Sequence, residues 1–323
     1  MKIVDRIYGE SDAREEVIND LINSKTLQRL KGISQFGMPD EFYHKKGFSR
    51  YEHCVGVMLL LNKLGAGLEE RIAGLLHDAS HTAFSHVIDW VIGDPSKEDY
   101  QDGIFIKFIE KSDVPEILDR YKLDYKKICD LEKFSLLENE APDICADRVD
   151  YALREIVGFE SPENFKLILN SLINYRRNMV FSLQSAAETF SNGYSRCQRE
   201  HWAGEQAKAR YHVLAGILKK GLELKIISLE DFWKTDYEII NILRDKGDKK
   251  IIDGLELLRK GFEVKESNGK NSFALKKKFR YVDPFVLSGD LLARLSDLSE
   301  DYKKSLENQK SQGNSIKYFE IIL

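Results

Sequence analysis

Residues 73–89 read AGLLHDASHTAFSHVID, and this short stretch holds three of the chain's seven histidines and two aspartates directly after a run of apolar residues. His77 and Asp78 are neighbours, so in a regular helix their side chains would diverge by about 100°. They converge on one point only at a helix end or a bend. Because burying an ionisable pair without partners is costly, the pattern suggests a divalent cation as the partner.

Two further segments offer residues that would complete such a site. The stretch GFSRYEHCVGVMLL (residues 47–60) has His53 at the opening of a helix, with Arg50 one turn earlier on the same face. In APDICADRVDYALRE (residues 141–155) one helical stripe carries Asp147, Asp150, Tyr151 and Arg154. Imidazole and carboxylate together suit transition ions and, with more oxygen ligands, magnesium or manganese.

The composition indicates a folded protein without a strong charge preference. The chain has 323 residues, 42% apolar and 32% charged, with a net charge of -4. This composition lies far from that of disordered chains. No global field attracts nucleic acid or anionic lipid, so we expect neither as a partner.

Several kinds of protein are disfavoured by local features. The four cysteines, at positions 54, 129, 145 and 197, form no C-x-x-C motif, which argues against a zinc ribbon or a disulfide framework and favours the cytoplasm. The opening MKIVDRIYGESDAREE is charged and lacks the apolar region of a signal peptide. The run VMLLL (residues 57–61) is too short to cross a membrane.

Apolar residues recur every three or four positions up to about residue 262, which predicts a mostly α, multi-helix bundle. Beyond it, FEVKE and SFALKKKFRYV flank the turn signal SNGKN and predict a β-hairpin. A polar helix after residue 298 and a final strand in IKYFEIIL follow. We expect a core at 1–180, a helical extension at 181–262 and a C-terminal region at 263–323. Lys276, Lys277 and Lys278 fit a charged, solvated edge strand better than a phosphate-binding patch.

The order His, His-Asp, Asp on separate helices resembles the HD-domain metal-dependent phosphohydrolases, and more narrowly their deoxynucleoside triphosphate triphosphohydrolase branch. The resemblance rests on four ordered blocks: LQRLKGISQFG (residues 27–37), FSRYEHCVGV (48–57), AGLLHDASHTAFSHVID (73–89) and ADRVDYALRE (146–155). A fainter likeness extends to about residue 245.

The resemblance implies an HD-domain helical bundle that binds one divalent ion, which could be Mn, Mg, Fe, Co, Ni or Zn. Its expected ligands are His53, His77, Asp78 and Asp147. Two coordination positions would then remain for water and a phosphate oxygen.

The same resemblance implies roles for residues around the ion. His81 and His86 would contact phosphate and assist proton transfer, with Asp89 orienting His86. The remaining expected contacts are to the substrate: Arg50 and Arg148 as phosphate clamps, Tyr151 beside the sugar and phosphate, Gln35 and Glu155 at the deoxyribose 3'-hydroxyl, and Phe36 where it would block a ribose 2'-hydroxyl.

Plainer interpretations stay open for several residues. Arg148 and Arg154 could be surface ion-pair partners of Glu155 or Asp150 on their own helix. His77 and His81, spaced H-x-x-x-H, could form a two-histidine zinc face, although this ignores Asp78. Isolated histidines are usually satisfied core residues, which is the expectation for His44, His201 and His212.

One departure from the family pattern affects the expected chemistry. Triphosphohydrolase relatives commonly have a further histidine, followed by glutamate, after the H-D block, but residues 96–108 (SKEDYQDGIFIKF) contain no histidine, and Tyr100 is near that place. Proton delivery would then fall to His86, Tyr100 or water. The stretch HWAGEQAKARY offers Lys208 and Arg210 as its basic residues, fewer than a triphosphate site suggests.

The sequence therefore predicts a metal-dependent phosphohydrolase acting on a nucleotide, first of all a deoxynucleoside triphosphate. A nucleoside monophosphate phosphatase or phosphodiesterase is the alternative enzyme. A catalytically inactive nucleotide-binding sensor is the alternative of a different class. We expect a homo-oligomer, with the apolar helices after residue 205 as a candidate interface.

Overall fold

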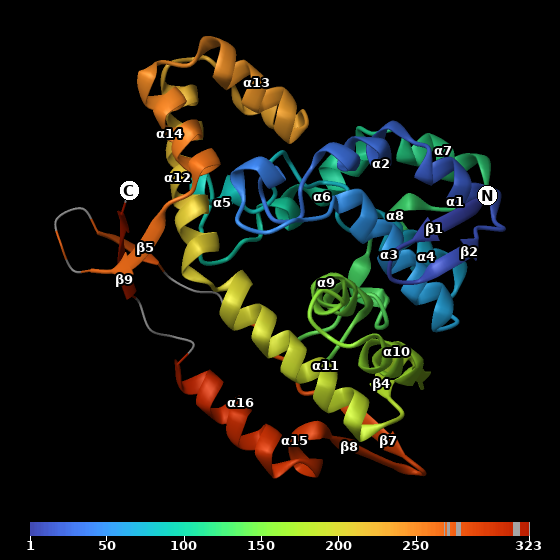
Figure 1. Ribbon diagram of the computed structural model, residues 1–323. Coiled ribbons are helices and arrows are strands. Elements are labelled where there is room, and N and C mark those ends of the chain that lie inside the picture. The colour runs from blue at the N-terminus through green and yellow to red at the C-terminus, as the bar shows by residue number, and fades with distance from the viewer. Residues whose placement is uncertain (268, 270–271, 276–278, 313–316, 323) are drawn as a thin grey trace.

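The computed structural model describes the chain except for residues 268, 270–271, 276–278, 313–316 and 323. The predicted lysine patch at 276–278 lies outside the described residues. In Figure 1 the N-terminal elements occupy one side, helices α12, α13 and α14 form an arm on the other, and α11 runs diagonally from the base of this arm toward β7 and β8. Mostly α is the correct fold class, with small sheets added.

The N-terminal half of the chain consists mostly of short helices. These elements are β1 (Lys2–Asp5), β2 (Gly9–Asp12), α1 (Glu16–Ile22), α2 (Lys25–Arg29), α3 (Arg50–Lys63), α4 (Leu68–Leu76), α5 (Val87–Val91), α6 (Tyr100–Glu110), α7 (Val114–Arg120), α8 (Tyr125–Ile128) and α9 (Ala146–Ile156). The start of α3 is fixed by a capping box, in which Ser49 and Glu52 each bond the other's backbone N–H.

The second half begins with long helices and ends in small sheets. Its elements are α10 (Pro162–Ser171), β3 (Leu172–Tyr175), β4 (Asn178–Phe181), α11 (Gln184–Cys197), α12 (Glu205–Glu223), α13 (Asp236–Lys246), α14 (Lys249–Lys260), β5 (Glu263–Glu266), β6 (Phe273–Leu275), β7 (Phe285–Ser288), β8 (Leu291–Arg294), α15 (Leu295–Leu298), α16 (Glu300–Gln312) and β9 (Lys317–Ile322). A π-helical turn, Gln198–Trp202, separates α11 from α12.

Two apolar clusters hold these elements together. The first joins α1, α3, α4, α9 and α11, and it includes Val282, Val286, Leu295 and Tyr302 from the C-terminal region. The second joins α12, α13 and α14 to residues 83–88 of the quoted stretch. The extension thus packs directly on the segment that carries His86. The boundaries proposed for three domains stay a prediction.

Asp236 ties the extension to the core at one point. This buried carboxylate at the start of α13 accepts backbone N–H groups from Ser34, at 2.9 Å, and from Phe84, at 2.7 Å. Both groups belong to loops that border the site.

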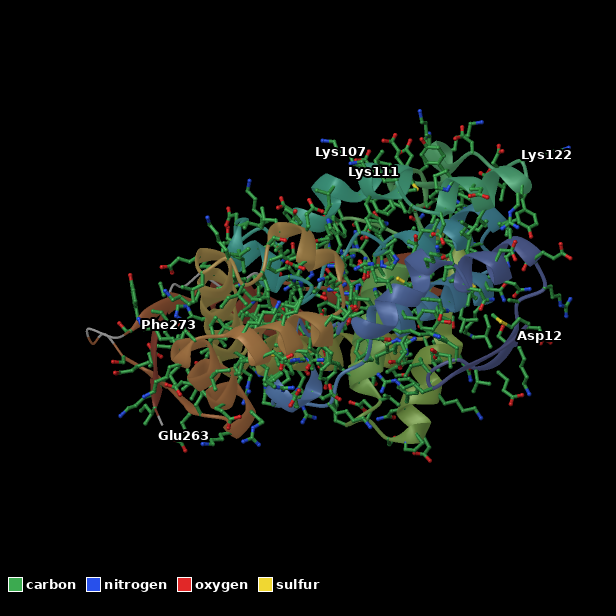
Figure 2. The ribbon with its side chains drawn as sticks, turned by 90° about the horizontal axis from the view of Figure 1, so that it is seen from above. Asp12, Lys107, Lys111, Lys122, Glu263 and Phe273 are labelled. Atoms are coloured by element: carbon green, nitrogen blue, oxygen red, sulfur yellow. The ribbon has the colours of Figure 1, made fainter. Side chains whose placement is uncertain are left out.

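The predicted C-terminal hairpin is wrong in its pairing. Strands β5 and β6 form where expected, but the sheet order is β5-β9-β6, and both strands pair antiparallel with β9. The predicted final strand therefore fills the position between them. Seen from above in Figure 2, Glu263 and Phe273 of this sheet lie at the opposite end of the molecule from Asp12. The predicted polar helix after residue 298 is confirmed as α16.

Three further strand pairs, β1–β2, β3–β4 and β7–β8, lie in regions where no strand was predicted. The β3–β4 turn explains why. Its central residues are Arg176 and Arg177, with φ of 51° and 66°. This backbone usually calls for glycine or asparagine, so the sequence lacks the expected turn signal.

Within the described ranges, no helix combines the length and apolar character needed to cross a membrane. All four cysteines are free and buried. The cytoplasmic location and the homo-oligomer stay predictions.

Candidate active site

The four expected metal ligands reach one place from three elements. His53 lies in the first turn of α3, and Asp147 is the second residue of α9. Helix α4 ends at Leu76, so His77 is its C-terminal cap and Asp78 is the first residue beyond it. This is the helix end at which neighbouring side chains can converge.

The donor atoms of these residues lie close together. His53 Nε2 is 2.9 Å from Asp147 Oδ1 and 3.2 Å from His77 Nε2. His77 Nε2 is 3.5 Å from Asp147 Oδ1. Asp78 approaches both imidazoles at 3.7 Å, with Oδ2 toward His53 and Oδ1 toward His77.

This donor set fits a divalent ion. Two atoms that each lie about 2.1 Å from one ion are separated by about 3.0 to 3.5 Å at tetrahedral or octahedral angles. Among the described residues, His53, His77 and Asp147 form a group whose ligand atoms all lie within 4.8 Å of one another. The separations among His53, His77 and Asp147 are therefore close to those of ligands to one ion, and Asp78 lies slightly farther out. The structure brings the four selected residues together, and their role as ligands stays a prediction.

The outer nitrogen of each imidazole is already occupied. His53 Nδ1 donates to Asp150 Oδ2 at 2.8 Å, and His77 Nδ1 donates to the backbone oxygen of Gly74 at 2.7 Å. Such contacts fix the ring and leave Nε2 free to bind a metal. Asp150 is held in turn by Arg154, which also pairs with Asp5 at 2.8 Å. Arg154 is thus the ion-pair partner of Asp150, as the plainer interpretation had it, but buried rather than at the surface.

A strained turn positions His86. Phe84 and Ser85 have φ of 64° and 46°, a left-handed backbone that non-glycine residues seldom adopt. Their surroundings hold the turn, because Asp236 accepts the Phe84 N–H and Arg50 Nε donates to Ser85 Oγ at 3.0 Å. The turn places the ring of His86 5.0 Å from that of His81, centroid to centroid.

The ion cluster opens into a cavity of about 850 Å³, and a smaller cavity of about 100 Å³ lies beside it. The larger one is lined by His77, Asp78, His81 and Asp147, among others. The smaller one is mostly aromatic. Its walls include Phe36, Tyr43, Phe48, Tyr151, His201, Trp202 and Tyr211. Six residues line both: Gln35, Arg50, His86, Glu98, Tyr151 and Arg280.

Comparisons with known proteins agree with this geometry. A family model for the HD domain matches residues 50–152. The metal-dependent phosphohydrolase cns2 of Cordyceps militaris is 32% identical over 75% of this chain and 72% of its own length. The chain belongs to the HD-domain metal-dependent phosphohydrolases.

Other relatives extend the likeness over the whole chain. The uncharacterized protein YdhJ of Bacillus subtilis is 37% identical, with 100% of this chain and 99% of that protein covered. A deoxynucleoside triphosphate triphosphohydrolase SAMHD1 homolog of Dictyostelium discoideum is 24% identical over 94% of this chain and 64% of its own length. The solved structure of a phosphohydrolase from Bacteroides thetaiotaomicron has the same fold, with a TM-score of 0.73 at 17% identity over 100% of this chain and 99% of that one.

The surroundings of the histidines in this HD-domain site shift their pKa values in opposite directions. Burial opposes protonation of His77, but the Asp78 and Asp147 carboxylates outweigh it and raise the pKa of His77 to about 9. Burial, together with the Arg50 charge, lowers the pKa of His81 to about 4. Burial likewise lowers the pKa of His86 to about 4. His81 and His86 are therefore neutral at pH 7, while a metal ion that binds His77 must displace its proton.

Arg50 and Arg148, the two arginines expected to bind phosphate in this HD phosphohydrolase, differ in whether their guanidinium donors already have partners. Arg50 donates from Nη1 to Asp78 Oδ2 at 2.6 Å, and in the part of the chain that the structure describes its buried Nη2 has no hydrogen-bond partner. Arg148 also lines the larger cavity. Its Nη1 and Nη2, however, donate to the backbone oxygen of Asn139, and Nη1 donates to that of Asp143. The ion-pair interpretation of Arg148 with Glu155 is not what the structure contains.

The expected sugar contacts line the small cavity. Gln35 Oε1 is buried and, counting described residues alone, lacks a hydrogen-bond partner. Glu155 already accepts bonds from His201 Nδ1, at 2.6 Å, and from Trp202 Nε1. Phe36 packs edge-on against His201, with centroids 4.4 Å apart. The sugar-binding roles of these residues stay predictions.

His86 and Tyr100, the two side chains expected to deliver a proton, lie in different surroundings. Asp89 Oδ2 lies 3.8 Å from His86 Nδ1, and Asp89 Oδ1 accepts the backbone N–H of Tyr100 at 3.1 Å. The Tyr100 ring packs against the second apolar cluster and is not part of either cavity lining described above. His86, which lines both cavities, is better placed to exchange a proton than Tyr100.

The zinc-face alternative does not gain a third ligand. His81 Nε2 lies 3.2 Å from Asp78 Oδ1 and forms no part of the candidate ion groups found among the described residues.

Sequence reasoning missed several cavity residues. His201 was expected to be a satisfied core histidine, and it is buried with Tyr43 and Glu155 as partners, yet it also lines the small cavity. The π-helical turn at 198–202 carries it there, and such turns are frequent at functional sites. His44 instead packs against the Tyr43 ring at a tilt, and His212 stacks on Phe273. Neither Glu98 nor Arg280 belongs to a sequence motif that would have identified it as a cavity residue.

Proposed function

We propose that this phosphohydrolase acts on nucleotides, with the nucleoside in the small aromatic cavity and the reacting phosphate beside the ion ligands. The observation that carries this proposal is that the two cavities adjoin and share Arg50, His86 and Tyr151 among their walls. A nucleotide matches these two adjoining cavities, because its flat base packs against aromatic side chains and its phosphate binds polar ones.

The chain's own residues account for binding of a phosphoryl group. The unpartnered Nη2 of Arg50 is a donor available to a phosphate oxygen. The Asp78 carboxylate holds Nη1 of the same guanidinium at 2.6 Å, so the side chain is oriented before substrate arrives. His81, neutral at pH 7, is available to accept a proton, and so is His86.

His53, His77, Asp78 and Asp147 would hold the divalent ion. When bound, such an ion lowers the pKa of a water molecule and offsets charge on the phosphate. Asp150 keeps the His53 ring oriented for this role.

Deoxynucleoside triphosphates are the first substrate class that we propose. The support is the SAMHD1 homolog, whose name states that activity, at 24% identity. The aromatic wall at Phe36, with Gln35 and Glu155 in the same cavity, agrees with recognition of a deoxyribose.

Nucleoside monophosphates are the second candidate, favoured by one observation. Arg148 is tied to the backbone oxygens of Asn139 and Asp143, so one of the two guanidinium groups expected to clamp a polyphosphate is already engaged. A site with fewer free cations suits a substrate with fewer phosphates.

A substrate panel separates the candidates. Phosphate release is measured from deoxynucleoside triphosphates, ribonucleoside triphosphates and deoxynucleoside monophosphates with Mn²⁺, Co²⁺, Ni²⁺ or Mg²⁺, with and without added pyrophosphatase and polyphosphatase. Triphosphate release from the first class, lost in Asp147→Ala, supports the leading proposal. Turnover of monophosphates alone supports the second. Thermal stabilisation by nucleotides without turnover in any metal would instead favour a nucleotide sensor.

A further inference from the structure

Arg280 comes from the C-terminal region, yet it lies at the junction of the two cavities. It is one of the six residues that line both. Its neighbours Phe279 and Tyr281 line the larger cavity, in which the ion ligands lie. The family match at residues 50–152 ends far upstream of this segment.

The segment is anchored firmly after Arg280. Tyr302 donates its hydroxyl to the backbone oxygen of Val282, and the Asp283 N–H donates to that of Pro142 at 2.8 Å. The Asp283 carboxylate accepts two bonds from Ser296. Residues 279–282 are thus fixed against the core on one side of the cavity, which lowers the entropy cost of using Arg280 as a ligand contact.

A buried carboxylate holds the guanidinium in place. Arg280 Nη2 donates to Glu98 Oε2 at 2.5 Å, and Lys208 Nζ donates to Glu98 Oε1 at 2.7 Å. The side chains of Glu98 and Lys208 are only 2% and 4% exposed, whereas that of Arg280 is 23% exposed. Of the two cations, Arg280 is the one that a ligand in the cavity can reach.

The charges of this cluster do not cancel. One carboxylate faces two cations, so the three side chains sum to one positive charge at the edge of the cavities. An excess buried charge is costly unless a counter-charge joins it. Glu98 has φ of 53°, which is unusual for a non-glycine residue and typical of backbone held under constraint at functional sites.

We propose that Arg280 binds a phosphoryl oxygen of the substrate at the junction of the cavities, on the phosphate next to the nucleoside, with Glu98 as its positioning residue. The inference rests on the proposed nucleotide substrate for the identity of that phosphate. Arg50 and Arg280 are the two arginines of the shared wall, and a guanidinium matches phosphate oxygens with two parallel donors.

The test uses metal-loaded full-length protein with inorganic phosphate and pyrophosphate as probes. Arg280→Gln removes the charge, Arg280→Lys keeps the charge without the paired donors, and Lys303→Gln removes one charge from the exposed face of α16 as the matched control. Calorimetric titration gives the affinities, and elemental analysis gives the metal content of each protein. We expect affinity to fall about 10- to 100-fold in Arg280→Gln, less in Arg280→Lys, and not at all in the control.

A measurement on the wild-type protein keeps the proposal testable if a variant fails to fold. Phenylglyoxal modifies accessible arginines, and mass spectrometry gives the rate at each one. Inorganic phosphate should protect Arg280, while the surface residue Arg259 should react at an unchanged rate. The proposal is overturned if Arg280 gains no protection, or if Arg280→Gln binds both probes as tightly as the wild type with its metal content intact.

The outcomes separate this inference from the proposed function. Phosphate binding that depends on Arg280, in a protein that hydrolyses no nucleotide, would support the inference and refute the proposed function. Nucleotide hydrolysis with unchanged KM and kcat in Arg280→Gln would do the reverse.

Discussion

Replacing Asp150 by asparagine should weaken binding of the divalent ion about 10- to 100-fold, although Asp150 is not expected to touch the ion. The Asp150 carboxylate accepts three contacts: one from His53 Nδ1 at 2.8 Å, and two from Arg154 at 2.8 and 3.2 Å. Asparagine offers one acceptor oxygen and turns an N–H₂ group toward the remaining donors. The His53 ring then loses the contact that places the proton of its neutral form on Nδ1 and aims Nε2 at the ion site.

The same change should destabilise the fold. All three side chains are buried, and charged hydrogen bonds contribute about 1.5 to 3 kcal/mol each. Arg154 retains Asp5 at 2.8 Å, so its charge is not left unpaired. We therefore expect the free energy of unfolding of the metal-free protein to fall by about 2 to 4 kcal/mol rather than by the sum of the three contacts.

Asp5→Asn is the matched control. Asp5 accepts from Arg154 Nη2, the nitrogen that also donates to Asp150 Oδ1, and within the described part of the chain no hydrogen bond or ion pair joins Asp5 to His53. It should lower stability in urea unfolding but leave the affinity for Mn²⁺, measured by calorimetric titration, within about twofold of the wild type. Equal losses of metal affinity in the two variants, or no loss in Asp150→Asn, would refute the reasoning.

Three other outcomes follow from the geometry. Chelation should abolish turnover, added Mn²⁺ should restore it in the wild type, and Asp147→Ala should bind no ion by elemental analysis. Gly56→Ala should lower the free energy of unfolding by about 2 kcal/mol or more in urea titrations, because the new Cβ would lie 2.0 Å from Arg154 Nη2 and 2.1 Å from Asp150 Oδ1; an unchanged midpoint would contradict this packing. Burial raises the pKa of Asp236 from 3.8 to about 7. Protonation of Asp236 therefore stabilises the folded state, and this contribution is fully present below about pH 4 and is lost as the pH rises toward 7. The unfolding free energy of wild type minus that of Asp236→Asn should therefore fall over that range, and a pH-independent difference would show that Asp236 titrates normally.

The local pattern at His77 and Asp78 pointed to an ion site, and the resemblance to HD-domain phosphohydrolases supplied the other two candidate ligands, His53 and Asp147. The structure brings the four side chains together, and their binding of an ion stays a prediction. His77 and Asp78 are unusual neighbours behind an apolar run, and their convergence needs the helix end that the structure has at Leu76. The fold class followed from the period of the apolar residues. The apolar period and the His77-Asp78 pair are local signals, whereas His53 and Asp147 join that pair only through contacts between distant helices.

The rest depended on contacts between distant parts of the chain. Glu98 and Arg280 meet across 182 positions, and neither lies in a recognisable motif. The left-handed turn at Phe84 and Ser85 is imposed by packing and by Asp236, since neither residue type favours that backbone. The Asn-Gly signal near residue 269 predicted that β5 and β6 pair with each other, because a local rule cannot anticipate a strand that arrives from residue 317 onward.

That late arrival sets an order for assembly during synthesis. While the ribosome is still adding α16, the candidate ion ligands have long emerged, since Asp147 is the last of them in the chain. Strands β5 and β6 have also been synthesised by then, but the backbone groups that will pair with β9 have no partner until residues 317–322 follow. The candidate ion ligands are therefore all synthesised well before β9, the strand that completes the three-stranded sheet.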